Sequence, residues 1–71
     1  MKIHFNRLCE LVYSVYYDCG VDDYIHDKPE EVERWAEERE DREYSSEDEV
    51  CREIRDEIEA ARKQGFLDGN Q

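Results

Sequence analysis

Apolar residues at helical spacing near the N-terminus are the feature that most constrains the fold of this chain. They recur every three or four positions between residues 5 and 19, as Phe5, Leu8, Leu11, Val12, Val15, Tyr16 and Cys19. At about 100° per residue these side chains gather on one face, and polar residues fall opposite. Gly20 follows, where helices commonly end in a left-handed residue. The pattern predicts an amphipathic helix over 5–19.

A strand is the competing interpretation for residues 11–17, because this stretch is rich in β-formers. The two faces of such a strand would be Leu11, Tyr13, Val15 and Tyr17 against Val12, Ser14 and Tyr16. That division separates apolar from polar side chains poorly. We therefore favour the helix.

A second helix is predicted over 28–43. In Asp27-Lys28-Pro29-Glu30, a capping residue precedes a proline in the first turn and a glutamate three positions after the cap. The apolar face of this helix is small, with Val32, Trp35 and Ala36 extended by the stem of Arg39. Glu30–Arg34 and Glu38–Arg42 are expected to support the helix as i,i+4 pairs.

A third helix is predicted over 46–64. Residues 46–49 (SEDE) form a second capping box, and an apolar stripe follows at helical spacing: Val50, Ile54, Ile58 and Ala61, flanked by Cys51. Gly65 suits the residue after the helix, Phe66 and Leu67 could fold back on Ala61, and residues 68–71 are expected to fray. With residues 21–27 as a connector, the sequence predicts one all-α domain of three helices over 1–71.

The composition allows only a thin core. Of the 71 residues, 38% are hydrophobic and 44% are charged, although eight are aromatic and can bury area. We expect a folded domain that is either a monomer or a homodimer completing its own core. No targeting segment and no apolar run long enough to span a bilayer is visible, so a cytoplasmic protein is expected.

Three cysteines leave an odd count. On one helix, Cys9 and Cys19 would lie about 15 Å apart, too far for a disulfide. A bond between Cys19 and Cys51 stays geometrically possible. Buried reduced thiols that act as small hydrophobic residues are the simpler expectation.

Acidic residues are concentrated in one segment. Residues 21–49 hold fourteen acidic and four basic residues, a net charge of −10 out of −11 for the whole chain. Such a segment repels nucleic acid and anionic membranes and attracts the basic surfaces that bind them. Direct binding to nucleic acid or to a membrane is therefore not expected.

Several of these acids fall on one side of the predicted 28–43 helix, where successive members lie about 5–6 Å apart, one turn along the helix. Phosphates along a nucleic-acid strand have a similar spacing, so a Lys/Arg groove could bind these carboxylates in charge-assisted pairs. The principal candidates are Glu33, Glu37, Glu40 and Asp41, supported by Glu30, Asp22, Asp23, Glu47 and Asp48. The alternative is a solvated face of a small soluble protein.

Catalytic and metal-binding motifs are absent from the sequence. It has no nucleophile elbow, no Gly-rich phosphate loop, no calcium-loop spacing and no zinc spacing of His and Cys. We expect neither enzymatic activity nor a cofactor or metal ion.

Tyr13 and Tyr17 fall on the outer side of the first predicted helix. Exposed tyrosines are frequent in interface hot spots. They favour an alternative function, a small interaction module of the antitoxin or adaptor kind that binds a partner protein through this aromatic face.

In size, acidity and helix-only patterning, the chain resembles the small acidic inhibitors encoded by phages and mobile elements, including DNA-mimic and anti-CRISPR proteins. The resemblance covers residues 22–49 and rests on composition. It implies inhibition of a host-defence nucleoprotein or nuclease by occupation of its DNA or RNA groove. A CRISPR effector, with its positively charged channel, would be the favoured target, and the host cytoplasm the site of action.

Overall fold

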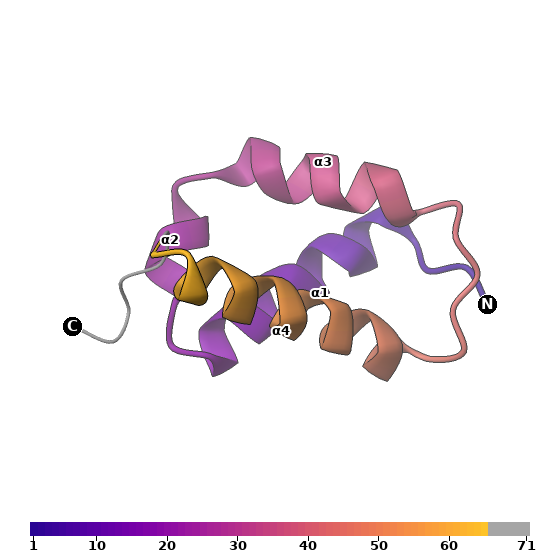
Figure 1. The fold of residues 1–71 in the computed structure, drawn as a ribbon. Coiled ribbons are helices and arrows are strands. Elements are labelled where there is room, and N and C mark those ends of the chain that lie inside the picture. Colours follow the sequence, from indigo (N-terminus) through magenta and orange to yellow (C-terminus); the bar gives the residue numbers. More distant parts are fainter. Residues whose placement is uncertain (66–71) are drawn as a thin grey trace.

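The computed structural model describes residues 1–65, which fold into four α-helices joined by short connections (Figure 1). The helices are α1 (Phe5–Asp18), α2 (Asp22–His26), α3 (Pro29–Arg39) and α4 (Glu47–Lys63). No strand occurs within residues 1–65, so the all-α prediction is confirmed and the strand interpretation of residues 11–17 is wrong. The predicted contacts of Phe66 and Leu67 and the predicted fraying of 68–71 lie outside the described residues.

Helix α1 is the element on which the others assemble. α3 and α4 both pack on it, and α2 packs against the end of α1 and against α3. In Figure 1, α1 and α4 run in the same direction across the view, and α3, at the top, runs in the opposite direction. α1 and α3, and likewise α3 and α4, are therefore antiparallel, so each connection reverses the chain at one end of the molecule.

The core follows the predicted apolar stripes. It is built from buried residues of all four helices and from Ile3, Val21 and Tyr44 in the connections. The helical members are Leu8, Leu11, Val12, Val15, Ile25, Val32, Ala36, Val50, Ile54 and Ile58. No polar or charged residue is buried within the described range. Hydrophobic burial therefore holds the helices together, as the periodicity predicts.

The end of α1 is a complete Schellman motif around Gly20. Gly20 has a φ of 78°, and its N–H donates to the carbonyl of Tyr17 at 3.0 Å. The N–H of Val21 donates to the carbonyl of Tyr16 at 3.0 Å. Both bonds satisfy carbonyl groups that the helix end would otherwise leave open. The predicted role of Gly20 is confirmed.

Residues 21–27 are not only a connector, because they contain the single-turn helix α2. The structure thus has four helices in residues 1–65 where three were predicted. Val21 and Ile25 are four residues apart and both buried, and one helical turn directs both toward the core. Two acids in the first turn also suit the positive end of the helix dipole.

Helix α3 begins later and ends earlier than predicted. Its N-cap residue is Lys28, without a side-chain cap, so the predicted cap at Asp27 is wrong. The helix ends at Arg39, well before residue 43, because the chain turns to bury Tyr44. The backbone of Tyr44 pairs with Met1: its N–H donates to the Met1 carbonyl at 2.8 Å, and the Met1 amine donates to its carbonyl at 2.6 Å.

The expected i,i+4 pairs of the second predicted helix do not form. Within residues 1–65 neither Glu30–Arg34 nor Glu38–Arg42 is an ion pair. Arg42 lies beyond the end of α3, in the turn that leads to Tyr44. Glu38 contacts Arg39 instead, at 3.4 Å.

Helix α4 has nearly the predicted bounds, with Ser46 at the N-cap and Gly65 after the C-cap at a φ of 84°. The predicted capping box is wrong by one residue, because Glu49 pairs with Ser45 and not with Ser46. The Glu49 carboxylate accepts hydrogen bonds from the N–H of Ser45 at 2.8 Å and from its hydroxyl at 2.9 Å, and the Ser46 side chain makes no capping bond. These bonds lower the pKa of Glu49.

The three cysteines are free and half-buried, and all pack against the core. Neither Cys19 nor Cys51 forms the disulfide that the sequence left open. Their placement agrees with the expectation of reduced thiols that act as small hydrophobic residues.

Candidate functional site

A row of exposed carboxylates runs along one side of α3 and into the turn after it. We call it the acidic stripe, and it consists of Glu30, Glu33, Glu37, Glu40 and Asp41. All five residues are exposed. None of them forms an ion pair with another residue of the described chain. Among the described residues, no basic group is in direct contact with a stripe carboxylate.

The stripe lies on the side of α3 turned away from α4. Trp35 and Arg39 point toward α4, and at about 100° per residue the stripe falls well away from them. Its neighbours are in the first part of the chain: the charge of Glu33 acts on Cys9, and Glu40 borders a shallow hollow with residues 2–5. Burial, together with Glu33, raises the pKa of the Cys9 thiol. Asp41, predicted on the helix, belongs to the turn after it.

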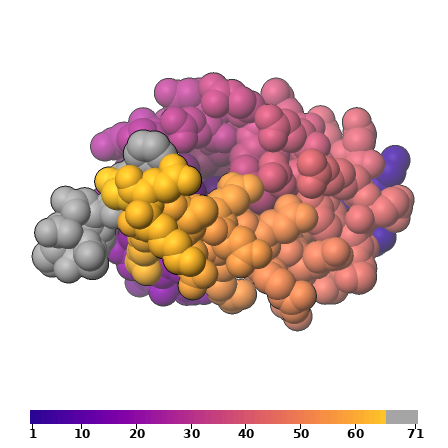
Figure 2. Space-filling view, viewed as in Figure 1, coloured from indigo at the N-terminus to yellow at the C-terminus, as the bar shows by residue number. Residues whose placement is uncertain are grey.

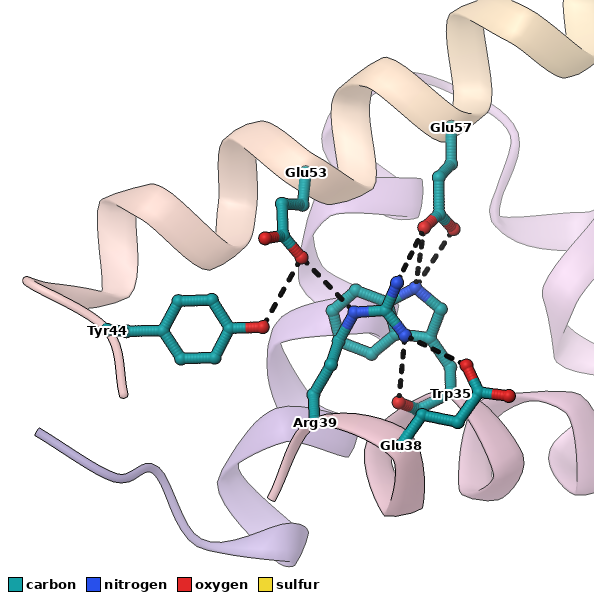
Figure 3. Close-up of polar contacts among 6 residues, drawn as sticks. All are labelled: Trp35, Glu38, Arg39, Tyr44, Glu53 and Glu57. Atoms are coloured by element: carbon teal, nitrogen blue, oxygen red, sulfur yellow. Dashed lines mark hydrogen bonds and ion pairs between the residues drawn. The ribbon is translucent and has the colours of Figure 1, made fainter. Parts of the chain in front are cut away.

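A second group of acids is bound within the molecule by Arg39 (Figure 3). The guanidinium contacts Glu53 at 3.1 Å and Glu57 at 3.0 Å, so it links α3 to α4. The Arg39 side chain is only 11% exposed, and its guanidinium lies 4.0 Å from the centre of the Trp35 ring. Unlike the stripe carboxylates, Glu53 and Glu57 are thus already engaged within the molecule.

Two further residues complete this network. The Trp35 indole N–H donates to both oxygens of Glu57, at 2.9 and 3.0 Å. The Tyr44 hydroxyl donates to Glu53 at 3.3 Å. The same two carboxylates of α4 thus receive bonds from Arg39, from an aromatic residue of α3 and from the chain after α3.

Arg7, on α1, forms ion pairs with two further acids. It forms two bonds of 2.8 Å with Glu47, and a third of 3.0 Å with Glu10. The bonds to Arg7 lower the pKa of Glu47. The Met1 amine lies 3.0 Å from Glu43 and lowers its pKa in the same way. Glu47, a predicted partner-binding residue, is therefore already engaged with α1.

The remaining acids from the prediction lie at opposite ends of the molecule. Asp22 is half-buried and Asp23 exposed in α2, near the end of α1, whereas Asp48 is exposed in the first turn of α4 (Figure 1). The structure does not gather them with the stripe into one compact cluster. They extend the acidic surface toward the two ends of α3.

Tyr13 and Tyr17 are exposed as predicted, at 38% and 70%. They line a shallow groove between α1 and α2, with a volume of about 470 Å³. The other lining residues are Glu10, Ser14, Asp22 and His26. Tyr13 lies one helical turn after Cys9, the residue on whose thiol the charge of Glu33 acts.

The sequence did not predict that Glu53 and Glu57 bind Arg39. It predicted only that the aliphatic stem of Arg39 extends the apolar face of its helix. One signal was present: Trp35 and Arg39 are four residues apart, as are Glu53 and Glu57, and each pair flanks an apolar stripe. Which pair would face which depends on how α3 and α4 lie on α1. That information is not local.

Within residues 1–65, no group of three or more His, Cys, Asp or Glu side chains is placed to hold a metal ion. None of the helices described is both long and apolar enough to cross a membrane. No protein-family model, curated protein or solved structure matches this chain. What the protein binds is therefore inferred from the chemistry of its surfaces.

Proposed function

We propose that this protein is a non-enzymatic inhibitor that binds the basic nucleic-acid-binding surface of a host-defence nucleoprotein or nuclease, in the manner of an anti-CRISPR protein. The acidic stripe occupies Lys and Arg side chains that otherwise hold phosphates. One observation carries the proposal: the five stripe carboxylates are exposed and free of internal ion pairs, whereas Glu47, Glu53 and Glu57 are bound to Arg7 and Arg39. Such an inhibitor acts in the host cytoplasm, with a CRISPR effector subunit as the favoured partner.

The spacing of the stripe supports this form of mimicry. Glu33, Glu37 and Glu40 follow one another by about one turn, so their Cβ atoms lie roughly 5–6 Å apart. Arg side chains that grip phosphates bind carboxylates by the same bidentate geometry. A negative surface also steers a basic partner toward it, which accelerates association and makes it sensitive to salt.

The test compares two variants with equal charge. The partner is first captured by affinity pull-down and identified by mass spectrometry, and its binding is challenged with competing nucleic acid. Glu33→Gln/Glu37→Gln/Glu40→Gln is expected to abolish inhibition while circular dichroism shows unchanged helicity. The control, Asp18→Asn/Asp56→Asn/Glu59→Gln, also removes three exposed charges and should retain inhibition. Full activity of the stripe variant would exclude mimicry by the stripe.

The tyrosine groove favours a second candidate, an antitoxin- or adaptor-like interaction module. Tyr17 is 70% exposed, and large exposed aromatic residues supply much of the energy at protein interfaces. If the protein is such a module, the double variant Tyr13→Ala/Tyr17→Ala should lose binding to the partner. Added salt should leave binding by the parent protein unchanged. Steep loss of binding with salt, and retention in the tyrosine variant, would favour the stripe instead.

A further inference from the structure

A small cavity lies between α1, α3 and α4, away from the acidic stripe. Its volume is about 100 Å³. Figure 2 shows this face of the molecule, where the surface is recessed between α3 and the orange α4. The lining combines four aliphatic residues, two aromatic residues and two acids: Val12, Ile25, Val32 and Ile54, then Tyr16 and Trp35, then Glu31 and Glu57.

The aromatic walls are held in place by their neighbours. The Tyr16 ring stacks on Tyr24, with centroids 6.4 Å apart and an interplanar angle of 8°. Trp35 is fixed by its hydrogen bonds to Glu57 and by the Arg39 guanidinium over its ring. Aromatic faces attract cations, most strongly where water is partly excluded. The two aromatic walls are therefore preorganised, with one face of the Trp35 ring already covered by Arg39.

Three oxygen acceptors border the cavity. Glu31 is exposed and has no ion-pair partner within residues 1–65. The Tyr16 hydroxyl makes no hydrogen bond to another described residue, and Glu57 accepts bonds from Trp35 and Arg39 but, as a carboxylate, has further lone pairs. Burial and the charges of Glu57, Tyr24 and Glu31 raise the pKa of Tyr16 to about 12. Two acids thus border the cavity: Glu57, which is paired with Arg39, and Glu31, which has no ion-pair partner within residues 1–65.

We propose that this cavity receives the ammonium group of a lysine side chain from the partner protein. The ammonium has three donors, which match Glu31, Glu57 and the Tyr16 oxygen, and the methylene stem contacts the aliphatic walls. The size agrees: one water needs about 10–15 Å³ and benzene occupies an engineered cavity of about 150 Å³. The planar guanidinium of arginine is bulkier. The identity of the donor as a partner lysine rests on the proposed function.

Trp35 provides a direct readout, because it is the single tryptophan of the chain. Titration with n-butylammonium, which reproduces the end of a lysine side chain, is expected to change the tryptophan fluorescence and to saturate. Butanol, a neutral molecule of similar length, should give no saturable change. A linear response to n-butylammonium, or an equal response to butanol, would overturn the proposal.

Two substitutions that each remove one negative charge test whether the cavity is the site. Glu31→Gln is expected to weaken n-butylammonium binding by about threefold, the effect of one partly exposed ion pair. Glu59→Gln removes the same charge at an exposed position of α4 outside the cavity and should leave binding unchanged. Equal weakening by both variants would mean that the amine responds only to total charge, and the cavity would not be the site.

The two proposals fail in different ways. If Glu31→Gln does not affect n-butylammonium binding, the cavity proposal falls and mimicry by the stripe stands. If the triple stripe variant inhibits fully, mimicry falls and the cavity proposal stands on the titration. Tyr16→Phe, which keeps the ring and removes the hydroxyl, provides a second variant and is expected to weaken binding without loss of helicity.

Discussion

At the level of single residues, Arg39 carries much of the contact between α3 and α4. The backbones of these two helices are not in close contact. The Arg39 guanidinium reaches across to Glu53 and Glu57 on α4 and also covers the Trp35 ring. The guanidinium is planar and holds its five donors in a fixed fork, so it can bind two carboxylates and stack on an aromatic ring at the same time, whereas an ammonium group cannot stack in this way. Arg39 therefore substitutes for apolar area that α3, with Val32 and Ala36 buried, does not offer.

Replacement of Arg39 should therefore destabilise the fold. Arg39→Ala is expected to lower the free energy of unfolding by about 1–3 kcal/mol, because it removes both packing and a largely buried ion-pair network. Urea denaturation followed by circular dichroism measures the change. The control is Arg34→Ala, which removes an exposed arginine of the same helix and should stay within about 0.5 kcal/mol. Equal effects of the two variants would contradict a special role for Arg39.

Tyr16 should ionise at a higher pH than an unperturbed tyrosine. Its pKa is raised to about 12 by burial and by Glu57, Tyr24 and Glu31, whereas an unperturbed tyrosine titrates near 10. The folded state thus holds this proton more tightly, so the associated stability is present below pH 10 and is lost as the pH rises through about 12. Absorbance of the tyrosinate at increasing pH should show a late step that Tyr16→Phe removes. A single step near pH 10 for all five tyrosines would contradict this.

At the level of elements, α1 and α3 end for different reasons. α1 ends through local chemistry, because Gly20 adopts a left-handed conformation that allows the Schellman bonds. α3 ends at Arg39 although the sequence after it is rich in helix-compatible residues. Its end is imposed by the burial of Tyr44 and by the bonds between Tyr44 and Met1.

The end of α1 depends on the left-handed conformation of Gly20, which a substitution can test. Gly20→Ala is expected to lower the free energy of unfolding by about 1 kcal/mol, because an L-residue pays for the left-handed conformation. A clash does not contribute, since no atom lies within 4 Å of the added Cβ. Gly20→Asn, a residue that tolerates this conformation, should cost less in the same thermal-unfolding measurement. A loss as large for asparagine as for alanine would refute the conformational explanation.

At the level of the whole molecule, a net charge of −11 on 71 residues opposes compactness. The internal ion pairs of Arg7 and Arg39 offset part of this repulsion, but no stripe residue forms an ion pair among the described residues. The same unpaired charges are those proposed to bind a basic partner. Stability and binding should therefore respond to salt in opposite directions.

Added salt is expected to raise the unfolding temperature of the free protein and to weaken binding to the partner, because it screens both repulsion and attraction. Thermal unfolding at several ionic strengths measures the first effect. The stripe variant Glu33→Gln/Glu37→Gln/Glu40→Gln should be more stable than the parent at low salt, by about 0.2–0.5 kcal/mol for the Glu33–Glu37 pair, and should respond less to salt. A fall in stability with salt would mean that the ion pairs outweigh the repulsion.

The sequence by itself determined the parts of this protein that depend on contacts within about one helical turn. The apolar period of residues 5–19 predicts α1, and that of 50–61 predicts most of α4. Gly20 and Gly65 mark the ends of both helices for steric reasons that need no partner. The concentration of acid in residues 21–49 and the exposure of Tyr13 and Tyr17 are also readable in the chain.

Only the tertiary structure decided which of those acids are free. Glu47 is engaged by Arg7, forty residues away in the chain, and Glu53 and Glu57 by Arg39, which lies fourteen and eighteen residues away. The helical turn of α2, the early end of α3 and the cavity beside Trp35 likewise depend on what packs against α1. Periodicity determines which face of a helix is buried, whereas the pairing of exposed charges depends on the packing of helices that are distant in sequence.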